Sequence, residues 1–430
     1  MHKIVNAIRA STFLKHNAIF FFGAVAAGAL NYAFYPVLAR LLSTSNFGEV
    51  QALCSLFAQV NIFLGVLGLL TVNIVANTKQ SGERDRIIIE LEKLALLIGA
   101  LLVVATLIMG SSLKHFFHFT SAWPFVWLAA AVLVSVPLMF RNSFLRGRQA
   151  FGLTSILGVI AAGVDLLLAV VSVLLHLQTT GVMVALVVAQ FLTFIYSSWL
   201  ARRRGFSGRW HETLLKLPDM RVITPELGYA TVVLVSSLTI TGLYSIDTIV
   251  VKHWFDAHTA GLYAGIATVA RIIFFVTASI AQVLLPSVRM NQSAKSNQQV
   301  LTKSLILLVS IGGGVLLLFM LLPKLVMETL MGQRFLPYAS LLPRLSIVIF
   351  LISVINLFML YHLALRRYAV VLIAVCGAVV TTALFAMHHH SLAAIINDLL
   401  CSCTLVAVLL GVWSITVRPV SVPMPDLDEA

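Results

Sequence analysis

Two long apolar segments are joined by Asn31-Tyr-Ala-Phe-Tyr-Pro-Val-Leu-Ala-Arg-Leu-Leu-Ser-Thr-Ser-Asn-Phe-Gly-Glu-Val-Gln-Ala-Leu53. A related stretch runs from Ser236 to Gly265. In both, an apolar segment ends at a basic residue, Arg40 or Lys252. Two large apolar residues and a short polar turn then lead to a glycine that opens the next segment. The shared order of residue types indicates an internal repeat.

The spacing of these stretches divides the chain into halves. Gly261 aligns with Gly48 at an offset of 261 − 48 = 213, close to half of the 430 residues. A second pair of basic turns, Phe144 to Phe151 and Leu363 to Val370, aligns at 367 − 148 = 219. Accident is the alternative, because membrane helices resemble one another in composition and short basic turns are common. We favour two homologous helical halves, as in many transporters.

The composition is that of a polytopic membrane protein. Hydrophobic residues make up 60% of the chain and charged residues 10%, with a mean hydropathy of +0.99. Soluble domains carry about 25% charged residues. The net charge of +13 would favour nucleic acid in a soluble chain. Here the basic residues stand in short loops between apolar runs, which positive-inside topology and anionic headgroups explain. We therefore expect no nucleic-acid partner, and the short loops leave no room for an enzyme's catalytic domain.

The apolar runs predict about twelve membrane-spanning helices, because each span needs roughly 20 mostly apolar residues. We treat the first run as a span, since no cleavage site of a signal peptide follows it. Basic residues are dense in every second loop and sparse in the others, so both termini are expected in the cytoplasm. The predicted spans are 17–39, 47–76, 88–110, 122–140, 153–175, 181–200, 225–251, 260–285, 301–322, 338–363, 368–387 and 391–413.

The longest polar connection, residues 201–224, also holds the densest basic cluster and sets the domain boundaries. We predict an N-terminal six-helix bundle over residues 1–200, followed at 201–224 by a basic cytoplasmic linker that lies on anionic headgroups. The C-terminal six-helix bundle is predicted over 225–418. The tail, 419–430, combines three prolines with three acidic residues, which is typical of a disordered cytoplasmic end.

Ionisable residues inside spans are costly, so each one is a functional candidate. Arg271 and Asp247 lie on neighbouring spans. They either form an ion pair that holds the helices together, or Arg271 is a cavity cation for an anionic phosphate. Asp165, Asp247 and Asp398 are candidate sites for a coupling proton or sodium ion, because a carboxylate in a low-dielectric cavity takes up such a cation readily. For Asp165 the alternative is a buried, hydrogen-bonded acid. Glu49 stands at a span end, from which it could reach the interface.

Uncharged polar residues are concentrated in spans 1, 2, 7, 8 and 10, where each needs a partner or water. Interhelical hydrogen bonds are the plain interpretation. Their concentration favours a hydrated cavity between the halves. The candidate residues of this cavity are Arg271, Asp247, Asn31, Tyr244, Gln282 and Asn61.

No motif predicts a metal, a cofactor or a catalytic centre. The run His388-His389-His390 could suggest a metal, but three consecutive residues of a regular element cannot all face one ion. We assign the run to an outer loop. The four cysteines fall inside apolar runs, where they are interpreted as small core residues.

These motifs resemble those of a known family. Leu38-Ala-Arg-Leu-Leu-Ser-Thr-Ser-Asn-Phe-Gly-Glu-Val50 is similar to the first inter-helix signature of polysaccharide-biosynthesis membrane proteins, the oligosaccharide flippase branch of the multidrug/oligosaccharidyl-lipid/polysaccharide exporter superfamily. Ser245-Ile-Asp-Thr-Ile-Val-Val-Lys252 and Ala260-Gly-Leu-Tyr-Ala-Gly265, followed by Arg271 and Pro286, resemble that family's seventh and eighth spans. The turn from Phe144 to Phe151 resembles its turn after span 4.

The resemblance implies two six-helix bundles around a central cavity in a bacterial cytoplasmic membrane. It implies a flippase that moves a lipid-linked oligosaccharide, a polyprenyl-pyrophosphate glycan, from the inner to the outer leaflet by alternating access. It carries Asp247 and Arg271 over as cavity positions, and Arg40 and Lys252 as outer-mouth positions. The implied partners are the lipid-linked glycan, membrane lipids, and a polysaccharide polymerase or glycosyltransferases.

Two other functions stay open. A cation-coupled drug or metabolite antiporter of the same superfamily would share the fold and would depend on acidic residues in the N-terminal half, where Asp165 is the candidate. A non-transporting membrane subunit of a polysaccharide synthase or export complex would tolerate neutral replacements of Asp165, Asp247 and Arg271.

Overall fold

The structure is a computed structural model that describes residues 23, 25–78, 80–206, 217–288, 294–365 and 367–416. All regular elements in these ranges are helices. Residues 207–216 of the predicted linker and the whole predicted tail lie outside the described residues.

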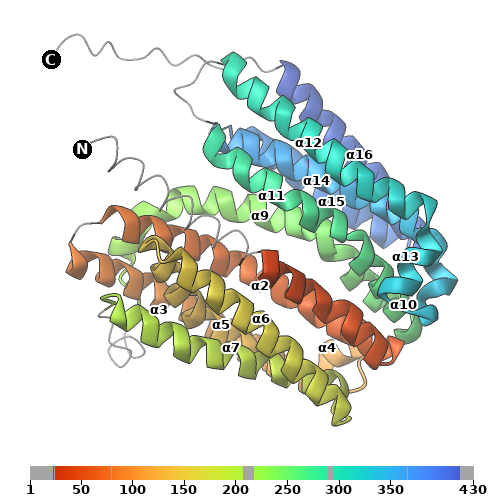
Figure 1. The fold of residues 1–430 in the computed structure, drawn as a ribbon, viewed down its shortest axis with the longest axis horizontal. Coiled ribbons are helices and arrows are strands. Elements are labelled where there is room, and N and C mark those ends of the chain that lie inside the picture. Colours follow the sequence, from red (N-terminus) through yellow and green to blue (C-terminus); the bar gives the residue numbers. More distant parts are fainter. Residues whose placement is uncertain are drawn as a thin grey trace, which may run out of the picture. The chain divides into compact units, whose positions relative to one another are not determined.

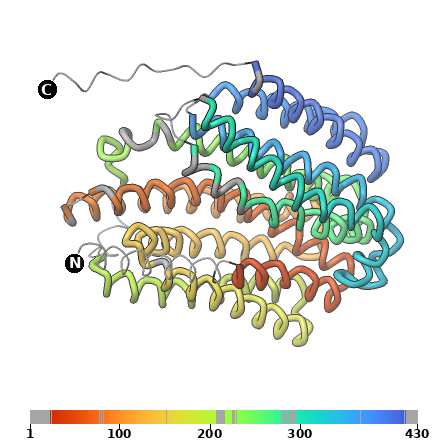
Figure 2. The backbone as a smooth tube through the Cα atoms, turned by 45° about the horizontal axis from the view of Figure 1, so that its top comes forward, coloured from red at the N-terminus to blue at the C-terminus, as the bar shows by residue number. Residues whose placement is uncertain are grey.

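Residues 25–41 form the first described helix, which is part of the first predicted span. Figures 1 and 2 show how the chain runs from one helix to the next. The labelled helices are α2 (Thr44–Asn77), α3 (Ser81–Ile108), α4 (Gly110–Phe116), α5 (Trp123–Gly147), α6 (Phe151–Leu174), α7 (Gln178–Arg203), α9 (Met220–Trp254), α10 (Ala257–Ala270), α11 (Ile272–Ser287), α12 (Ala294–Leu321), α13 (Pro323–Leu330), η1 (Gln333–Leu341), α14 (Leu342–Ala364), α15 (Ala369–Met387) and α16 (Leu392–Thr416).

The described helices confirm a multi-pass membrane protein. Ten of them are long and apolar enough to cross a membrane, and the bent pair of α3 and α4 makes an eleventh if it counts as one span. These eleven correspond in order to predicted spans 2–12. The pair bends by 67° at Met109. Residue boundaries shift by several positions, and α5 continues to Gly147 where the sequence predicted an end near Phe140.

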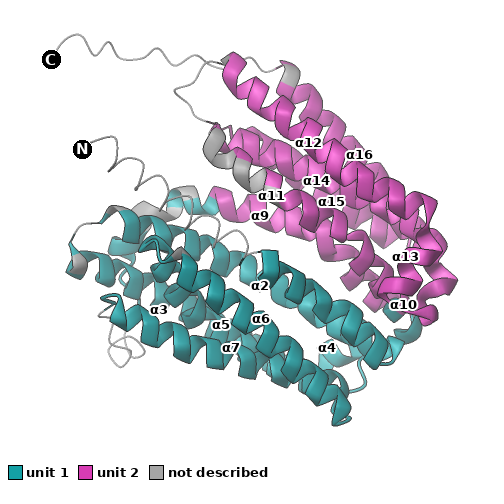
Figure 3. Ribbon diagram, viewed as in Figure 1, with its two compact units in different colours: residues 1–231, 256–261 teal, residues 232–255, 262–430 magenta. Residues whose placement is uncertain are grey.

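The helices form two compact units, shown in two colours in Figure 3. The first comprises residues 1–231 and 256–261, and the second comprises residues 232–255 and 262–430. In the first, α5 packs against α2, α3 and α7, and α6 packs against α7. In the second, α14 packs against α11, α12 and α16, and α15 packs against α16.

The two packing patterns match helix for helix. The central helix of each unit, α5 or α14, is the fourth predicted span of its half, and it contacts the second, third and sixth spans of that half. In both halves the fifth span packs against the sixth. This correspondence confirms two pseudo-symmetric halves, which the repeated sequence stretches predicted.

The repeated turn begins the next helix in the same way in both halves. The side chain of Ser43 accepts a hydrogen bond from the Asn46 N–H (3.2 Å) at the start of α2. The Asp256 carboxylate accepts hydrogen bonds from the N–H groups of His258 (3.0 Å) and Thr259 (2.9 Å) at the start of α10. These caps satisfy N–H groups that have no partner within the helix. Their offset, 256 − 43 = 213, equals that of the two glycines that follow them.

A buried ion pair joins α3 to α5 in the first unit. The Arg141 guanidinium donates from Nη1 and Nη2 to the two Glu92 carboxylate oxygens at 3.0 and 3.1 Å. Arg141 also lies over the Phe206 ring, 4.3 Å from its centroid. Arg141 lies one residue beyond the predicted end of the fourth span at 140, and it is inside α5 because that helix continues to Gly147. The side chain is buried because Glu92 offers a bidentate partner of opposite charge.

The two ends of the predicted linker are held by α3. Arg84 Nη2 donates to the Gly205 carbonyl (3.2 Å), and the Asp219 N–H donates to the Glu90 carboxylate (2.7 Å). The last five residues of the predicted linker, 220–224, already belong to α9. The first unit therefore contains both ends of the connection between the two halves.

Candidate functional site

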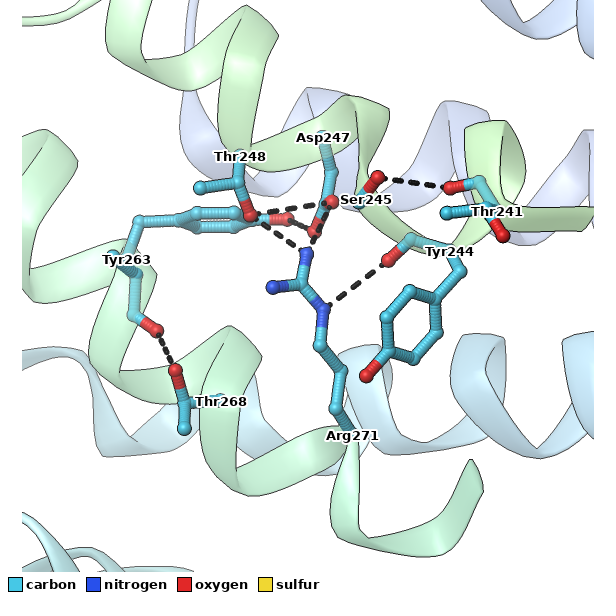
Figure 4. A network of polar contacts seen from close by, with 9 residues as sticks. Thr241, Tyr244, Ser245, Asp247, Thr248, Tyr263, Thr268 and Arg271 are labelled. Atoms are coloured by element: carbon cyan, nitrogen blue, oxygen red, sulfur yellow. Dashed lines mark hydrogen bonds and ion pairs between the residues drawn. The ribbon is translucent and has the colours of Figure 1, made fainter. Parts of the chain in front are cut away.

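The eighth span is interrupted at Arg271, which separates α10 from α11. Its backbone stays close to helical values (φ −64°, ψ −11°), and its N–H donates to the Ala267 carbonyl at 3.0 Å. The side chain is nevertheless directed to the neighbouring helix α9, as Figure 4 shows. The eighth span thus carries one guanidinium inside the second unit.

Arg271 and Asp247 form a direct ion pair in the second unit (Figure 4). Arg271 Nη2 lies 2.8 Å from Asp247 Oδ1 and 2.7 Å from Thr248 Oγ1. Its Nε donates to the Tyr244 carbonyl at 3.2 Å. The Tyr263 hydroxyl donates to the other carboxylate oxygen, Asp247 Oδ2, at 2.7 Å. Residues of α9 and α10 therefore surround both charges with hydrogen bonds.

This network is buried and electrically compensated. The side chains of Arg271 and Asp247 are 5% and 2% exposed. The guanidinium carbon also lies 5.0 Å from the centroid of the Tyr244 ring, within range of a cation–π contact. Two such charges are tolerated away from water because each neutralises the other and further hydrogen bonds satisfy their polar atoms. This is the geometry of the structural ion pair, which was one of the two interpretations of the sequence.

Asp165 has the opposite environment. It lies in the middle of α6, and its Oδ1 is buried without a hydrogen-bond partner among the described residues. The residue as a whole is half-buried. A carboxylate with a buried oxygen and no counter-charge favours binding of a proton or a cation. Of the three predicted coupling acids, Asp165 is the one without an ion-pair partner among the described residues.

The other two predicted coupling acids each have a basic neighbour. Asp247 is paired with Arg271, as described above. In α16, Asp398 Oδ1 lies 3.4 Å from His388 Nδ1, whereas its Oδ2 is buried without a hydrogen-bond partner among the described residues, as Oδ1 of Asp165 is. A cation would have to compete with Arg271 or with a protonated His388 for these carboxylates. The adjoining His389 ring stacks on Trp254 with centroids 3.7 Å apart, and the described residues contain no cluster suited to a metal ion.

The remaining predicted residues are distributed between the two units. Asn31 is exposed, and Asn61 donates from Nδ2 to the Phe57 carbonyl of its own helix (2.9 Å). Both belong to the first unit, whereas Tyr244 lies beside Arg271 in the second. Gln282 lies in α11, and its side chain is outside the described part.

The two basic residues predicted at the outer mouth differ in burial. Arg40 is exposed, whereas Lys252 is only 1% exposed. The structure therefore puts Lys252 inside the second unit, and its predicted role at a mouth remains a prediction.

The two repeated glycines contact each other within the first unit. A Cβ atom on Gly48 would lie 2.7 Å from the Cα of Gly261 and 2.9 Å from its nitrogen. A Cβ atom on Gly261 would overlap the carbonyl oxygen of Thr44. Only glycine permits this approach, because backbone atoms cannot move aside as a flexible side chain can. The starts of α2 and α10 therefore meet backbone to backbone.

A family comparison agrees with this repeated all-helical architecture. The model of the family described as polysaccharide biosynthesis protein matches residues 14–292, which is more than half of the chain. The chain belongs to the polysaccharide biosynthesis protein family. None of the curated protein sequences matches this member of the family.

Several solved structures share the fold of this polysaccharide biosynthesis protein. The lipid II flippase MurJ in an inward closed conformation superposes with a TM-score of 0.70 at 11% identity, over 93% of this chain and 88% of that chain. An inward-facing multidrug resistance MATE transporter of the MOP superfamily gives 0.66 at 14% identity, over 90% and 93%. The eukaryotic MATE transporter AtDTX14 gives 0.62 at 14% identity, over 94% and 96%. At these identities the likeness concerns the fold.

The burial of Glu49 in this polysaccharide biosynthesis protein was not predicted from the sequence. Glu49 was expected to reach the interface, and that expectation was wrong because its side chain is fully buried. Its Oε1 accepts from the Thr120 N–H (3.0 Å), and its Oε2 accepts from the Thr179 hydroxyl (2.8 Å). These donors stand 71 and 130 residues away in the chain, so no local pattern could reveal them.

Proposed function

We propose that this protein moves a lipid-linked oligosaccharide, a polyprenyl-pyrophosphate glycan, from the inner to the outer leaflet of a bacterial cytoplasmic membrane. The family match over residues 14–292 carries the proposal. The chain shares its fold with a protein described as a lipid II flippase. This supports the proposal, because the substrate named for that protein is also a lipid. Two similar helical halves are the usual architecture for alternating access.

The coupling step belongs to Asp165 in this proposal. Its carboxylate, which has one buried oxygen without a hydrogen-bond partner among the described residues, changes its charge when a proton or sodium ion binds, and such a change can favour one conformation over another. Arg271 and Asp247 contribute differently, because they neutralise each other inside the second unit. Their role in transport is to keep α9 and α10 joined while the protein changes conformation.

The substrate proposal is tested in cells that lack this protein. Deletion is expected to reduce the surface polysaccharide and to accumulate the lipid-linked precursor on the cytoplasmic side of the membrane. Surface glycan and extracted precursor are measured together, and a plasmid copy should restore both. A fall in surface glycan without accumulated precursor would contradict transport and favour the non-transporting subunit of a synthase complex.

Asp165→Asn is expected to lose most of the export while the protein stays folded. Asparagine keeps the volume of the side chain but cannot exchange a proton or bind sodium as a carboxylate does. Export is measured as surface glycan at matched membrane levels, and folding is measured by thermal unfolding in detergent. Asp398→Asn is the matched control, because the Asp398 carboxylate has a basic neighbour, His388 Nδ1, 3.4 Å from its Oδ1.

Normal export by Asp165→Asn would exclude Asp165 as the coupling site.

A cation-coupled drug antiporter is the second candidate function, since the solved structures that share the fold include multidrug transporters and Asp165 lies in the N-terminal half. In that case deletion would leave the surface glycan unchanged and would increase drug sensitivity, and Asp165→Asn would reproduce the sensitivity.

A further inference from the structure

The first unit contains an apolar cavity of about 320 Å³ between α2, α3, α4 and α5. Its deep wall includes Phe125, which is 1% exposed, and Ala129, which is 3% exposed. Leu102 of α3 also lines it and is 42% exposed, so the cavity has an open side at α3. The cavity is lined entirely by residues of the first unit.

The walls offer hydrocarbon rather than hydrogen-bonding groups. Only two of the twelve lining residues are polar, Gln59 and Thr106, and the Thr106 hydroxyl donates to the Leu102 carbonyl within α3 (2.7 Å). A site that holds water needs several polar partners for each water molecule. This cavity therefore suits an apolar occupant.

The open side lies on a face of α3 that is apolar and exposed. Leu101, Val104, Leu107 and Ile108 are 51–77% exposed in the last two turns of this helix. In a membrane protein such a face contacts lipid chains, because hydrocarbon is the solvent at that depth. A cavity left empty would forfeit the dispersion contacts of its lining atoms. Lipid hydrocarbon is thus both available at the opening and favoured inside.

One end of the cavity carries features of the membrane interface. The wall includes Leu113 of α4 and Phe117, the residue that follows this helix. The helix α4 turns by 67° from α3, which is closer to the membrane plane than to the direction of a span. The neighbouring α5 begins at Trp123, which is 64% exposed. Exposed tryptophans are enriched where membrane meets water. This end of the cavity therefore lies at headgroup depth.

A basic residue stands beside this end. Lys114 lies in the last turn of α4, three residues before Phe117, which caps the end of that helix, so the two side chains are neighbours at this end of α4. Its carbonyl accepts a hydrogen bond from the Phe119 N–H (2.9 Å), but among the described residues none forms a hydrogen bond or an ion pair with its ammonium group. An ammonium group at headgroup depth attracts the phosphate of an anionic lipid.

We propose that the cavity binds one acyl chain of an anionic phospholipid, whose phosphate is held by Lys114. A phospholipid is favoured over a scarcer lipid-linked intermediate because bulk lipid surrounds the opening at high concentration, and occupancy follows concentration. The bound chain fills the gap behind the bend between α3 and α4. This site is separate from Asp165 and from the ion pair of the second unit, and the proposal does not depend on the transported substrate.

The test uses the full-length protein in vesicles of phosphatidylethanolamine and phosphatidylglycerol. A trace of phosphatidylglycerol carries a photoreactive diazirine in its acyl chain, and the labelled peptides are located by mass spectrometry. We expect labelling of Leu102 to Thr106 and of Phe125 to Val132 that excess unlabelled phosphatidylglycerol suppresses. Lys114→Gln should abolish the preference for phosphatidylglycerol over a phosphatidylethanolamine probe.

Two variants complete the test, one that fills the cavity and one that narrows its opening. Ala129→Phe fills the deep wall, and Leu102→Trp narrows the open side, which is tolerant of larger side chains because it is exposed. Each should lower labelling by about tenfold, because the added ring occupies the space of the acyl chain or obstructs its entry. Ala105→Phe is the matched control: it adds the same ring on an exposed position of α3 outside the cavity and should leave labelling unchanged.

Three results would overturn the proposal. One is labelling spread evenly over exposed apolar faces, such as that of α6. Another is labelling of the two segments that persists in folded Leu102→Trp protein. The third is displacement of the probe by a polyprenyl phosphate at far lower concentration than phosphatidylglycerol, which would assign the cavity to a polyprenyl chain instead.

Discussion

Arg271→Ala is expected to remove folded protein from the membrane and to abolish export. The substitution leaves the Asp247 carboxylate buried with only hydroxyl partners, because Arg271 supplies its counter-charge at 2.8 Å. Removing one partner of a buried ion pair costs about 3–5 kcal/mol. The midpoint of thermal unfolding in detergent and the yield from membranes measure this loss.

The double variant Arg271→Met with Asp247→Asn separates structure from transport. It removes both charges together and keeps the size of the side chains, and an amide in place of the carboxylate can still accept the Tyr263 hydrogen bond. Replacing a buried pair by neutral groups of similar volume is often close to neutral for stability. We therefore expect the double variant to regain folding and export relative to Arg271→Ala. Arg344→Ala, at an exposed position of α14, is the control and should behave as the unaltered protein.

A folded double variant without export would change the conclusion. It would show that the charges act on the substrate or on the conformational cycle, as in the cavity interpretation of Arg271. Recovery of both folding and export would establish the pair as structural. The two outcomes are distinguishable because folding and surface glycan are measured on the same membranes.

Gly261→Ala is expected to prevent the close approach of α2 and α10. The added Cβ atom would overlap the carbonyl oxygen of Thr44, and a backbone carbonyl in a helix cannot rotate away. Overpacking of this kind costs about 1–3 kcal/mol, and more where backbone must move. We expect a lower unfolding midpoint and loss of export, with Gly48→Ala giving the same direction of change because its Cβ would also meet backbone atoms.

Gly242→Ala is the matched control for both glycine variants. Gly242 lies inside α9, and a Cβ atom there would meet nothing within 4 Å. Alanine in a helix interior is favoured over glycine by about 0.5–1 kcal/mol, so this variant should be unchanged or slightly more stable. If Gly261→Ala behaved like Gly242→Ala, the contact between the two glycines would have no energetic importance.

Much of the fold follows from local sequence information. Apolar runs located the spans, and the repeated turns around Gly48 and Gly261 predicted two equivalent halves. Arg271 and Asp247 could be paired from the sequence because both are ionisable, both lie inside spans, and the two spans are adjacent in the chain. Their partners Tyr263 and Thr248 gave no such signal, since tyrosine and threonine are ordinary residues of apolar helices.

The contacts that escaped prediction join distant parts of the chain. Glu49 pairs with Thr120 and Thr179, and Arg141 pairs with Glu92, which lies 49 residues earlier. A sequence pattern shows that a charge lies near a span end, but burial depends on which helix packs against it. The repeat also predicted that Gly48 and Gly261 are equivalent, whereas their direct contact needed the structure.

The two helix caps of the repeated turn differ in how they respond to acid. The hydroxyl of Ser43 does not titrate, so the start of α2 keeps its cap at any acidity. Hydrogen bonds from Thr259 lower the pKa of the Asp256 carboxyl below its usual 3.8. Because the folded pKa is depressed, this cap contributes fully above pH 3.8 and is lost only as the pH falls through the lowered value. Both helix starts therefore withstand moderate acidification, and strong acid would weaken only that of α10.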